Sequence, residues 1–170
     1  DECHITRKPL LATLIIGVVG GVVMIYADLL VFGKYEQALI DSYANKPSIP
    51  FMLASITQGA VMEEVMLRLF WMTLVAFVLH LLFERKREEA STVMLVVANV
   101  VAALLFAAGH LPATEMMFGL TPMLVFRCFL LNGGFGLAFG WLYRRFGLRY
   151  AMIAHGACHV VSKLIWILFL

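Results

Sequence analysis

Three ionisable side chains lie close together in the stretch AVMEEVMLRLFW, which covers residues 60–71 and is otherwise apolar. Glu64 and Arg68 are four residues apart, so on a helix they share one face and can pair, which largely cancels their charges. Glu63 lies about 100° round the helix from Glu64 and points elsewhere. An unpaired carboxylate in a medium of low dielectric can act as a general base or acid near neutral pH. The spacing therefore predicts a structural pair, Glu64 with Arg68, and one reactive candidate, Glu63.

Three histidines accompany other apolar runs of the chain. His110 follows the third run, and His155 and His159 are four residues apart in the last run, where a helix would place them on one face. Together with Glu63, imidazoles on separate helices can activate a water molecule and stabilise an oxyanion. One glutamate with two or three histidines also suits zinc. These four residues predict a catalytic or metal site, and a structural role or heme ligation stays open as another reading of the histidines.

Other polar residues within the apolar runs are candidates for supporting such a site. Arg127 and Asn132 lie in the fourth run, and we expect them to act in this way. Asp28, near the end of the first run, is expected at the membrane interface. Lys163, in the last run, has no assigned role.

Apolar runs long enough to cross a membrane make up most of the chain. It has 170 residues, of which 62% are hydrophobic, and its mean hydropathy is +0.91, whereas a soluble domain is about 45–50% apolar. A helix that crosses the bilayer needs about 20 such residues. We therefore predict an all-α, polytopic transmembrane helical bundle that forms a single integral membrane domain over residues 1–170. Its five candidate spans are Leu10–Phe32, Phe51–Phe83, Ser91–Leu111, Thr121–Tyr143 and Arg149–Leu170.

The distribution of lysine and arginine predicts the orientation, because cytoplasmic loops carry the excess. With the N-terminus inside, the outer loops hold only Lys34 and Lys46. The inner segments then hold Arg7, Lys8, Arg85, Lys86, Arg87, Arg144, Arg145 and Arg149. The first run is longer than the core of a signal peptide, so we interpret it as a retained span. The chain begins at Asp1, which leaves upstream segments open.

Charge and cysteine content exclude other classes of protein. A net charge of +2 is too small to indicate a nucleic-acid partner. The chain has three cysteines, Cys3, Cys128 and Cys158, which give no disulfide framework. We expect the two in the apolar runs to be small buried residues.

Three groups of residues follow one another on separate predicted spans: Glu63-Glu64-Val-Met-Leu-Arg68, Phe106-Ala-Ala-Gly-His110 and the stretch Arg127–His155. In this order they resemble the EExxxR motif, the FxxxH motif and the later conserved blocks of the CAAX protease and bacteriocin-processing (CPBP/Abi) family. These proteins are intramembrane metalloproteases related to the type II CAAX prenyl endopeptidases. The resemblance covers residues 58–161. It implies a protease-like core over about 51–170, preceded by a first span and loop in residues 1–50.

The resemblance implies hydrolysis of peptide bonds in peptides or proteins that lie in or at the membrane. Glu63 would be the base that activates water, assisted by His110. His155 and His159 would stabilise the oxyanion, or would complete a metal site with Glu63 and His110. Zinc is the cofactor that the family name suggests, and a metal-independent glutamate mechanism is the alternative. The resemblance is to bacterial or archaeal members, so we expect a prokaryotic cytoplasmic membrane.

One position departs from the family pattern. The last motif of the family is a histidine followed four residues later by asparagine or aspartate, and here the second position is His159. A neutral imidazole can still donate a hydrogen bond or bind a metal. The departure also leaves open a catalytically degenerate binding or scaffold protein of the same fold. A histidine-based heme- or ion-binding bundle is a further alternative, and the oligomeric state is not predicted.

Overall fold

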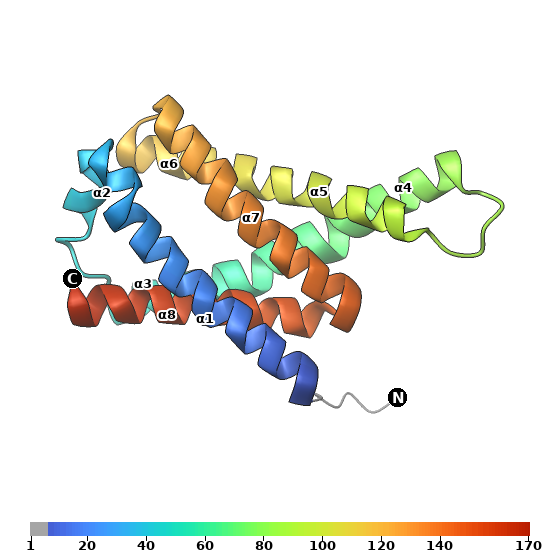
Figure 1. Ribbon diagram of the computed structural model, residues 1–170, viewed down its shortest axis with the longest axis horizontal. Coiled ribbons are helices and arrows are strands. Elements are labelled where there is room, and N and C mark those ends of the chain that lie inside the picture. Colours follow the sequence, from blue (N-terminus) through green and yellow to red (C-terminus); the bar gives the residue numbers. More distant parts are fainter. Residues whose placement is uncertain (1–6) are drawn as a thin grey trace.

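Helices account for almost all of the structure. The computed structural model describes residues 7–170, and this range contains no strand (Figure 1). The α-helices are α1 (Arg7–Leu30), α2 (Gln37–Ser42), α3 (Ile49–Ile56), α4 (Thr73–Phe83), α5 (Thr92–Gly109), α6 (Leu111–Phe118), α7 (Pro122–Phe146) and α8 (Leu148–Phe169). A 3₁₀ turn, η1 (Phe32–Lys34), follows α1, and two π-helical segments, η2 (Thr57–Glu63) and η3 (Val65–Met72), join α3 to α4.

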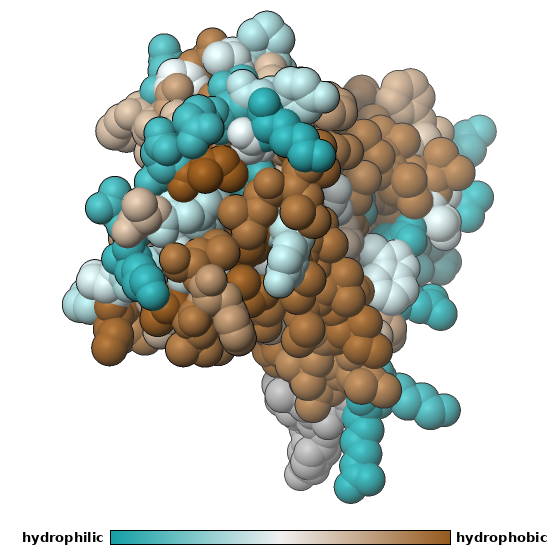
Figure 2. All heavy atoms as spheres, turned by 60° about the vertical axis from the view of Figure 1, so that its left-hand side comes forward, coloured by the Kyte–Doolittle hydropathy of each residue, from teal (hydrophilic) through white to brown (hydrophobic). Residues whose placement is uncertain are grey.

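Within residues 7–170, five stretches of helix are long and apolar enough to cross a membrane: Arg7–Lys34, Ile49–Phe83, Thr92–Phe118, Pro122–Phe146 and Leu148–Phe169. This confirms the predicted fold class and the number and order of the spans. The third span differs most, because it continues through α6 to Phe118 instead of ending near Leu111. Figure 2 shows a continuous hydrophobic surface over the middle of one face, with hydrophilic residues gathered along its borders.

Successive spans run in alternate directions, so the connections between them gather at two ends of the bundle (Figure 1). The start of α1, the loop between α4 and α5 and the turn between α7 and α8 lie at the right-hand end. The α2 helix, the turn between α6 and α7 and the C-terminus lie at the left-hand end. The basic residues that predict the cytoplasmic side belong to the first group. Which side of the membrane this end faces stays a prediction.

The starts and ends of several helices follow from local chemistry. Ser48, Ser91 and Thr121 each accept a hydrogen bond from the backbone N–H three residues further on, which caps α3, α5 and α7. The α6 and α7 helices end at Gly119 and Gly147, whose φ angles of 77° and 98° favour glycine. These caps and glycines set the lengths of the helices that carry the candidate site.

The first and last spans, α1 and α8, form the most extensive helix–helix interface among the described residues. Glycine makes this close approach possible. A Cβ at Gly17 would lie 2.6 Å from the Cβ of Ala157, and one at Gly21 would lie 2.7 Å from the Cβ of Val161. Small residues spaced four apart let membrane helices pack backbone to backbone. The interface holds α8, which carries two of the candidate histidines, against the start of the chain.

The cysteines that the structure describes are free and buried, as expected for Cys128 and Cys158. The thiol of Cys128 donates to the carbonyl of Ala107 at 3.1 Å, which links α7 to α5. Cys3 lies outside the described residues.

The second span is the one with irregular geometry. It is helical from Ile49 to Phe83, but its central part, η2 and η3, is π-helical. In a π-helix the backbone bonds span five residues instead of four, and such segments are frequent at functional sites. Glu63, Glu64 and Arg68 all lie in or between these two segments. The wide turns of the second span therefore coincide with its ionisable residues.

Candidate active site

A buried ion pair on the second span anchors the candidate site. The side chains of Glu64 and Arg68 are fully buried, and Glu64 Oε2 lies 3.2 Å from Arg68 Nε. The contact lacks hydrogen-bond geometry, and among the described residues no hydrogen-bond partner reaches the guanidinium. The guanidinium carbon instead lies 5.3 Å from the centroid of the Phe106 ring, a cation–π contact. The two residues thus pair as their spacing predicts, and the cation–π contact with Phe106 further stabilises the charge of Arg68.

Glu64 also holds His155, a contact that sequence reasoning did not anticipate. Glu64 Oε1 lies 2.9 Å from His155 Nδ1. Because a carboxylate oxygen accepts, Nδ1 carries the proton and donates, and in the neutral ring Nε2 keeps its lone pair. The buried ring of His155 stacks on those of Phe139 and His159, with centroids 4.6 Å and 5.0 Å away. Glu64 and the stacked rings together fix the orientation of this imidazole.

Glu63 is the less compensated of the two adjacent carboxylates. Its side chain is 17% exposed, and its Oε2 lies 3.8 Å from His155 Nε2. This distance is too long for a hydrogen bond, so two acceptor atoms face each other with space for a bridging donor. A water oxygen about 2.8 Å from each atom could donate one proton to Glu63 and the other to His155.

His110 lies between α5 and α6, inside the third span rather than at its end. Its Nδ1 lies 2.8 Å from the carbonyl oxygen of Phe106. Because a carbonyl oxygen accepts, Nδ1 carries the proton and Nε2 keeps a lone pair. The backbone of α5 thus sets the tautomer of His110, as Glu64 does for the imidazole on α8.

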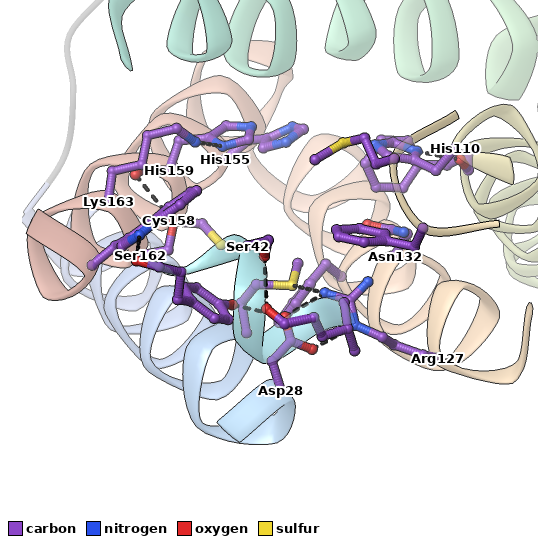
Figure 3. Close-up of a pocket in the computed structure, with 18 of the residues that line it drawn as sticks. Asp28, Ser42, His110, Arg127, Asn132, His155, Cys158, His159, Ser162 and Lys163 are labelled. Carbon is purple, nitrogen blue, oxygen red and sulfur yellow. Dashed lines mark hydrogen bonds and ion pairs between the residues drawn. The ribbon is translucent and has the colours of Figure 1, made fainter. Parts of the chain in front are cut away.

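A cavity of about 240 Å³ brings the three imidazoles together. His110, His155 and His159 all line it, as does Asn132. Figure 3 shows His110 across the cavity from the two histidines of α8. Glu63 is not among the residues that line this cavity, and the approach of its carboxylate to His155 Nε2 connects it to the imidazoles. The structure therefore gathers the predicted histidines at one place and keeps the predicted base beside one of them.

Sequence reasoning missed two residues at the α8 histidines, Lys163 and Gly59. Lys163 Nζ lies 3.1 Å from His159 Nδ1. A Cβ at Gly59 would touch His159 Nε2 and lie 3.0 Å from His155 Nε2, so this glycine lets the backbone of η2 approach both rings. The spacing of four residues between His159 and Lys163 is visible in the sequence. The approach of Gly59 depends on the packing of η2 against α8 and has no local sequence signal.

Arg127 is held by a carboxylate of the first span. Its Nε and Nη2 lie 2.5 Å and 2.6 Å from the two oxygens of Asp28, and the hydroxyl of Tyr43 donates to the same carboxylate at 2.8 Å. This network buries Asp28 to 2% exposure, and its expected place at the membrane interface stays a prediction. Burial and the charge of Asp28 raise the pKa of Tyr43 well above its ordinary value. Asn132, the other supporting candidate, donates to Cys128 Sγ at 3.3 Å and faces the cavity.

The predicted ligand set fits a metal ion poorly. Within residues 7–170, no three histidine, cysteine, aspartate or glutamate side chains are close enough together to hold one ion. The ammonium of Lys163 also lies beside His159, and a positive charge at a ligand opposes the binding of a cation. We therefore describe the chemistry through the side chains of the chain itself, and zinc stays an untested prediction.

The fold and the site define a class of protein: a multi-pass helical membrane protein with carboxylates and histidines gathered inside its spans. Residues 45–161 match the family model of the type II CAAX prenyl endopeptidase Rce1-like proteins. This match covers more than half of the chain, so the protein belongs to that family, and the resemblance drawn from the three motifs is confirmed. Comparison with curated proteins and with solved structures gives no match. The protein is thus an integral membrane protein of a protease family, and α1 lies outside the matched region.

Proposed function

We propose that this protein is an intramembrane endopeptidase that uses a glutamate-activated water to hydrolyse small or membrane-associated peptides. One observation carries the proposal: Glu63 Oε2 lies 3.8 Å from His155 Nε2, while Glu64 fixes the ring through its other nitrogen. Two acceptors at this separation suit a water that donates one proton to each. A general base must be able to reach the proton it abstracts in this way, directly or through one water.

Glu63 acts as the general base in this mechanism. It takes a proton from the water, and the water oxygen attacks the carbonyl carbon of the peptide bond. The C–N bond then breaks, and the proton passes from Glu63 to the leaving nitrogen, so the products are a carboxylic acid and an amine. His155 Nε2 orients the water, and His110 Nε2, across the cavity, is a second acceptor that assists. Because His155 has its lone pair at Nε2, His159 is the better candidate for contact with the oxyanion.

The position of the site inside apolar spans favours substrates that lie in or at the bilayer. His110, His155 and His159 all belong to membrane-spanning stretches, and the cavity that they line measures about 240 Å³. A short segment of extended peptide is the ligand that we expect there, and we expect the protein in a prokaryotic cytoplasmic membrane.

The test of the proposal is peptide cleavage by the purified protein in lipid vesicles, with a library of peptides. Glu63→Gln and His110→Ala should each lower the rate, and loss of a general base costs about 10²–10⁴-fold. Glu115→Gln is the matched control, since Glu115 is an exposed carboxylate on α6. Equal cleavage by wild type and Glu63→Gln would overturn the proposal. Peptide binding without any cleavage would instead favour the degenerate binding protein.

The same preparation answers the question of zinc. The poor fit of the ligand set leads us to expect that cleavage survives treatment with a chelator, with metal content measured alongside. Activity that is lost on chelation and restored by zinc would establish a metal-dependent reaction instead.

A further inference from the structure

Lys163 is a partly buried lysine that the proposed reaction does not yet use. It lies on α8, one helical turn after His159, and its Nζ is 3.1 Å from His159 Nδ1. Among the ion pairs of the described residues, none involves Lys163. A lysine ammonium has three donor hydrogens and no acceptor. The hydrogen bond therefore runs from Lys163 to His159, and Nδ1 of this ring accepts it.

This direction gives His159 a different tautomer from the other two imidazoles in the cavity. A neutral ring that accepts at Nδ1 carries its hydrogen on Nε2. His110 and His155 donate from Nδ1, to a backbone carbonyl and to Glu64, so both have a lone pair at Nε2. Of the three imidazoles that line the cavity, His159 is the one that offers an N–H from Nε2.

The backbone of Gly59 packs against this edge of the His159 ring, and the Nε2 atom of His155 lies close by. The position that a Cβ at Gly59 would occupy touches His159 Nε2 and is 3.0 Å from His155 Nε2. The donor of the His159 ring and the acceptor of the His155 ring therefore lie next to each other, in the stacked arrangement whose centroids are 5.0 Å apart. A reaction in which a water attacks a carbonyl needs these two functions side by side, an acceptor for the water and a donor for the oxyanion.

We propose that Lys163 is a positioning residue that holds His159 in the Nε2–H tautomer, so that His159 donates a hydrogen bond to the oxyanion of the scissile peptide. This inference rests on the proposed endopeptidase function. The positive charge of Lys163 also polarises the ring, which makes its N–H a stronger donor. With Lys163 beside it, His159 is a neutral N–H donor. An amide side chain at the same position would also be a neutral donor, and it has no tautomers.

The tautomers can be measured directly, without a substrate. In protein labelled with ¹⁵N-histidine, nitrogen chemical shifts should show His159 protonated at Nε2 and both His110 and His155 protonated at Nδ1. In Lys163→Met, His159 should shift towards a mixture of tautomers, while the other two histidines keep theirs. A His159 that is protonated at Nδ1 in the wild type would overturn the inference, whatever the protein cleaves.

The kinetic test is a double-mutant cycle. Lys163→Met should lower kcat with little change in KM, and by less than His159→Ala, because loss of a whole oxyanion donor costs about 10²–10³-fold. His159→Asn should retain activity, since an amide donates without tautomers. In the His159→Asn background, Lys163→Met should have almost no further effect on kcat. Lys34→Met, at an exposed lysine after α1, is the matched control for loss of a charge.

The outcomes separate the two claims. If wild-type cleavage is independent of Glu63, the proposed function itself fails. If cleavage depends on Glu63 but Lys163→Met matches the wild type, the role of Lys163 is overturned. An equal loss from Lys163→Met with histidine or asparagine at position 159 would show that Lys163 acts by its charge alone, which also overturns the tautomer role.

Discussion

Removing one charge of the buried ion pair should destabilise the protein far more than removing the carboxylate next to it. Glu64→Gln leaves the guanidinium of Arg68 charged and fully buried, without the oxygen that now lies 3.2 Å from it. Breaking a buried pair by removing one partner costs about 3–5 kcal/mol of unfolding free energy. Glu63→Gln leaves the ion pair of Glu64 with Arg68 in place, and the Glu63 side chain is itself 17% exposed. We expect this substitution to cost less than about 1 kcal/mol.

The free energy of unfolding can be measured by titration with a denaturing detergent in mixed micelles, followed by circular dichroism. The double variant Glu64→Leu/Arg68→Met is the control, because apolar residues in place of both partners of a buried pair are often neutral or stabilising. It should regain most of the stability that Glu64→Gln loses. It should still cleave poorly, because His155 has lost the carboxylate that fixes its ring. A Glu64→Gln variant as stable as the wild type would refute the argument that the pair is buried and mutually compensating.

Three further predictions follow from contacts described above. Gly59→Ala should abolish cleavage while the helix persists, because its Cβ would press against the two α8 imidazoles. Gly134→Ala is the control, since a Cβ there meets nothing within 4 Å. Normal activity of Gly59→Ala would contradict the reasoning. Tyr43→Phe removes the donor to the buried aspartate of α1 and should cost about 1.5–3 kcal/mol below pH ~10. Because the pKa of Tyr43 is raised in the folded protein, its contribution is complete below the pKa of about 10 of an unfolded tyrosine and is lost as pH rises above that value. The difference in unfolding free energy between Tyr43→Phe and the wild type should therefore shrink at alkaline pH, and a difference that stays constant would count against it. Finally, the predicted orientation can be tested in intact cells with a thiol reagent that does not cross the membrane. It should react with the cysteine of Lys46→Cys and not with that of Lys86→Cys. The reverse pattern would show that the orientation is inverted.

The sequence carries enough information for the spans and for local pairs. Long apolar runs define the five spans, because hydrophobic length alone decides which segments can cross a bilayer. The pair of Glu64 with Arg68 follows from a spacing of four residues. The link between His159 and Lys163 has the same spacing and was available by the same rule. It was missed because a lysine in a span can either reach towards the interface or pair, and Lys163 was left without an assigned role.

Other parts of the site depend on contacts between distant segments, which no local pattern encodes. Asp28 and Arg127 are 99 positions apart in the sequence, and their pairing requires that α1 and α7 meet. The contact of Glu64 with His155 joins positions 91 apart. The depth of His110 could not be fixed either, because the helix continues beyond it through α6, past Pro112. A proline at the second position of a helix is compatible with its first turn, so its presence does not end the span.

The interface between α1 and α8 also constrains how the protein is assembled. Of the five described spans, the one made earliest at the ribosome finds its main partner in the one made latest, so this bundle closes only after α8 has been made. Until then the glycine face of α1 has no helix against it. Contacts between residues far apart in sequence are slow to form. A chain that stops before α8 would still hold four of the described spans, yet it would lack both this closing interface and the imidazoles of α8. Packing of α8 against α1 therefore closes the bundle and brings two of the three imidazoles to the cavity in the same step.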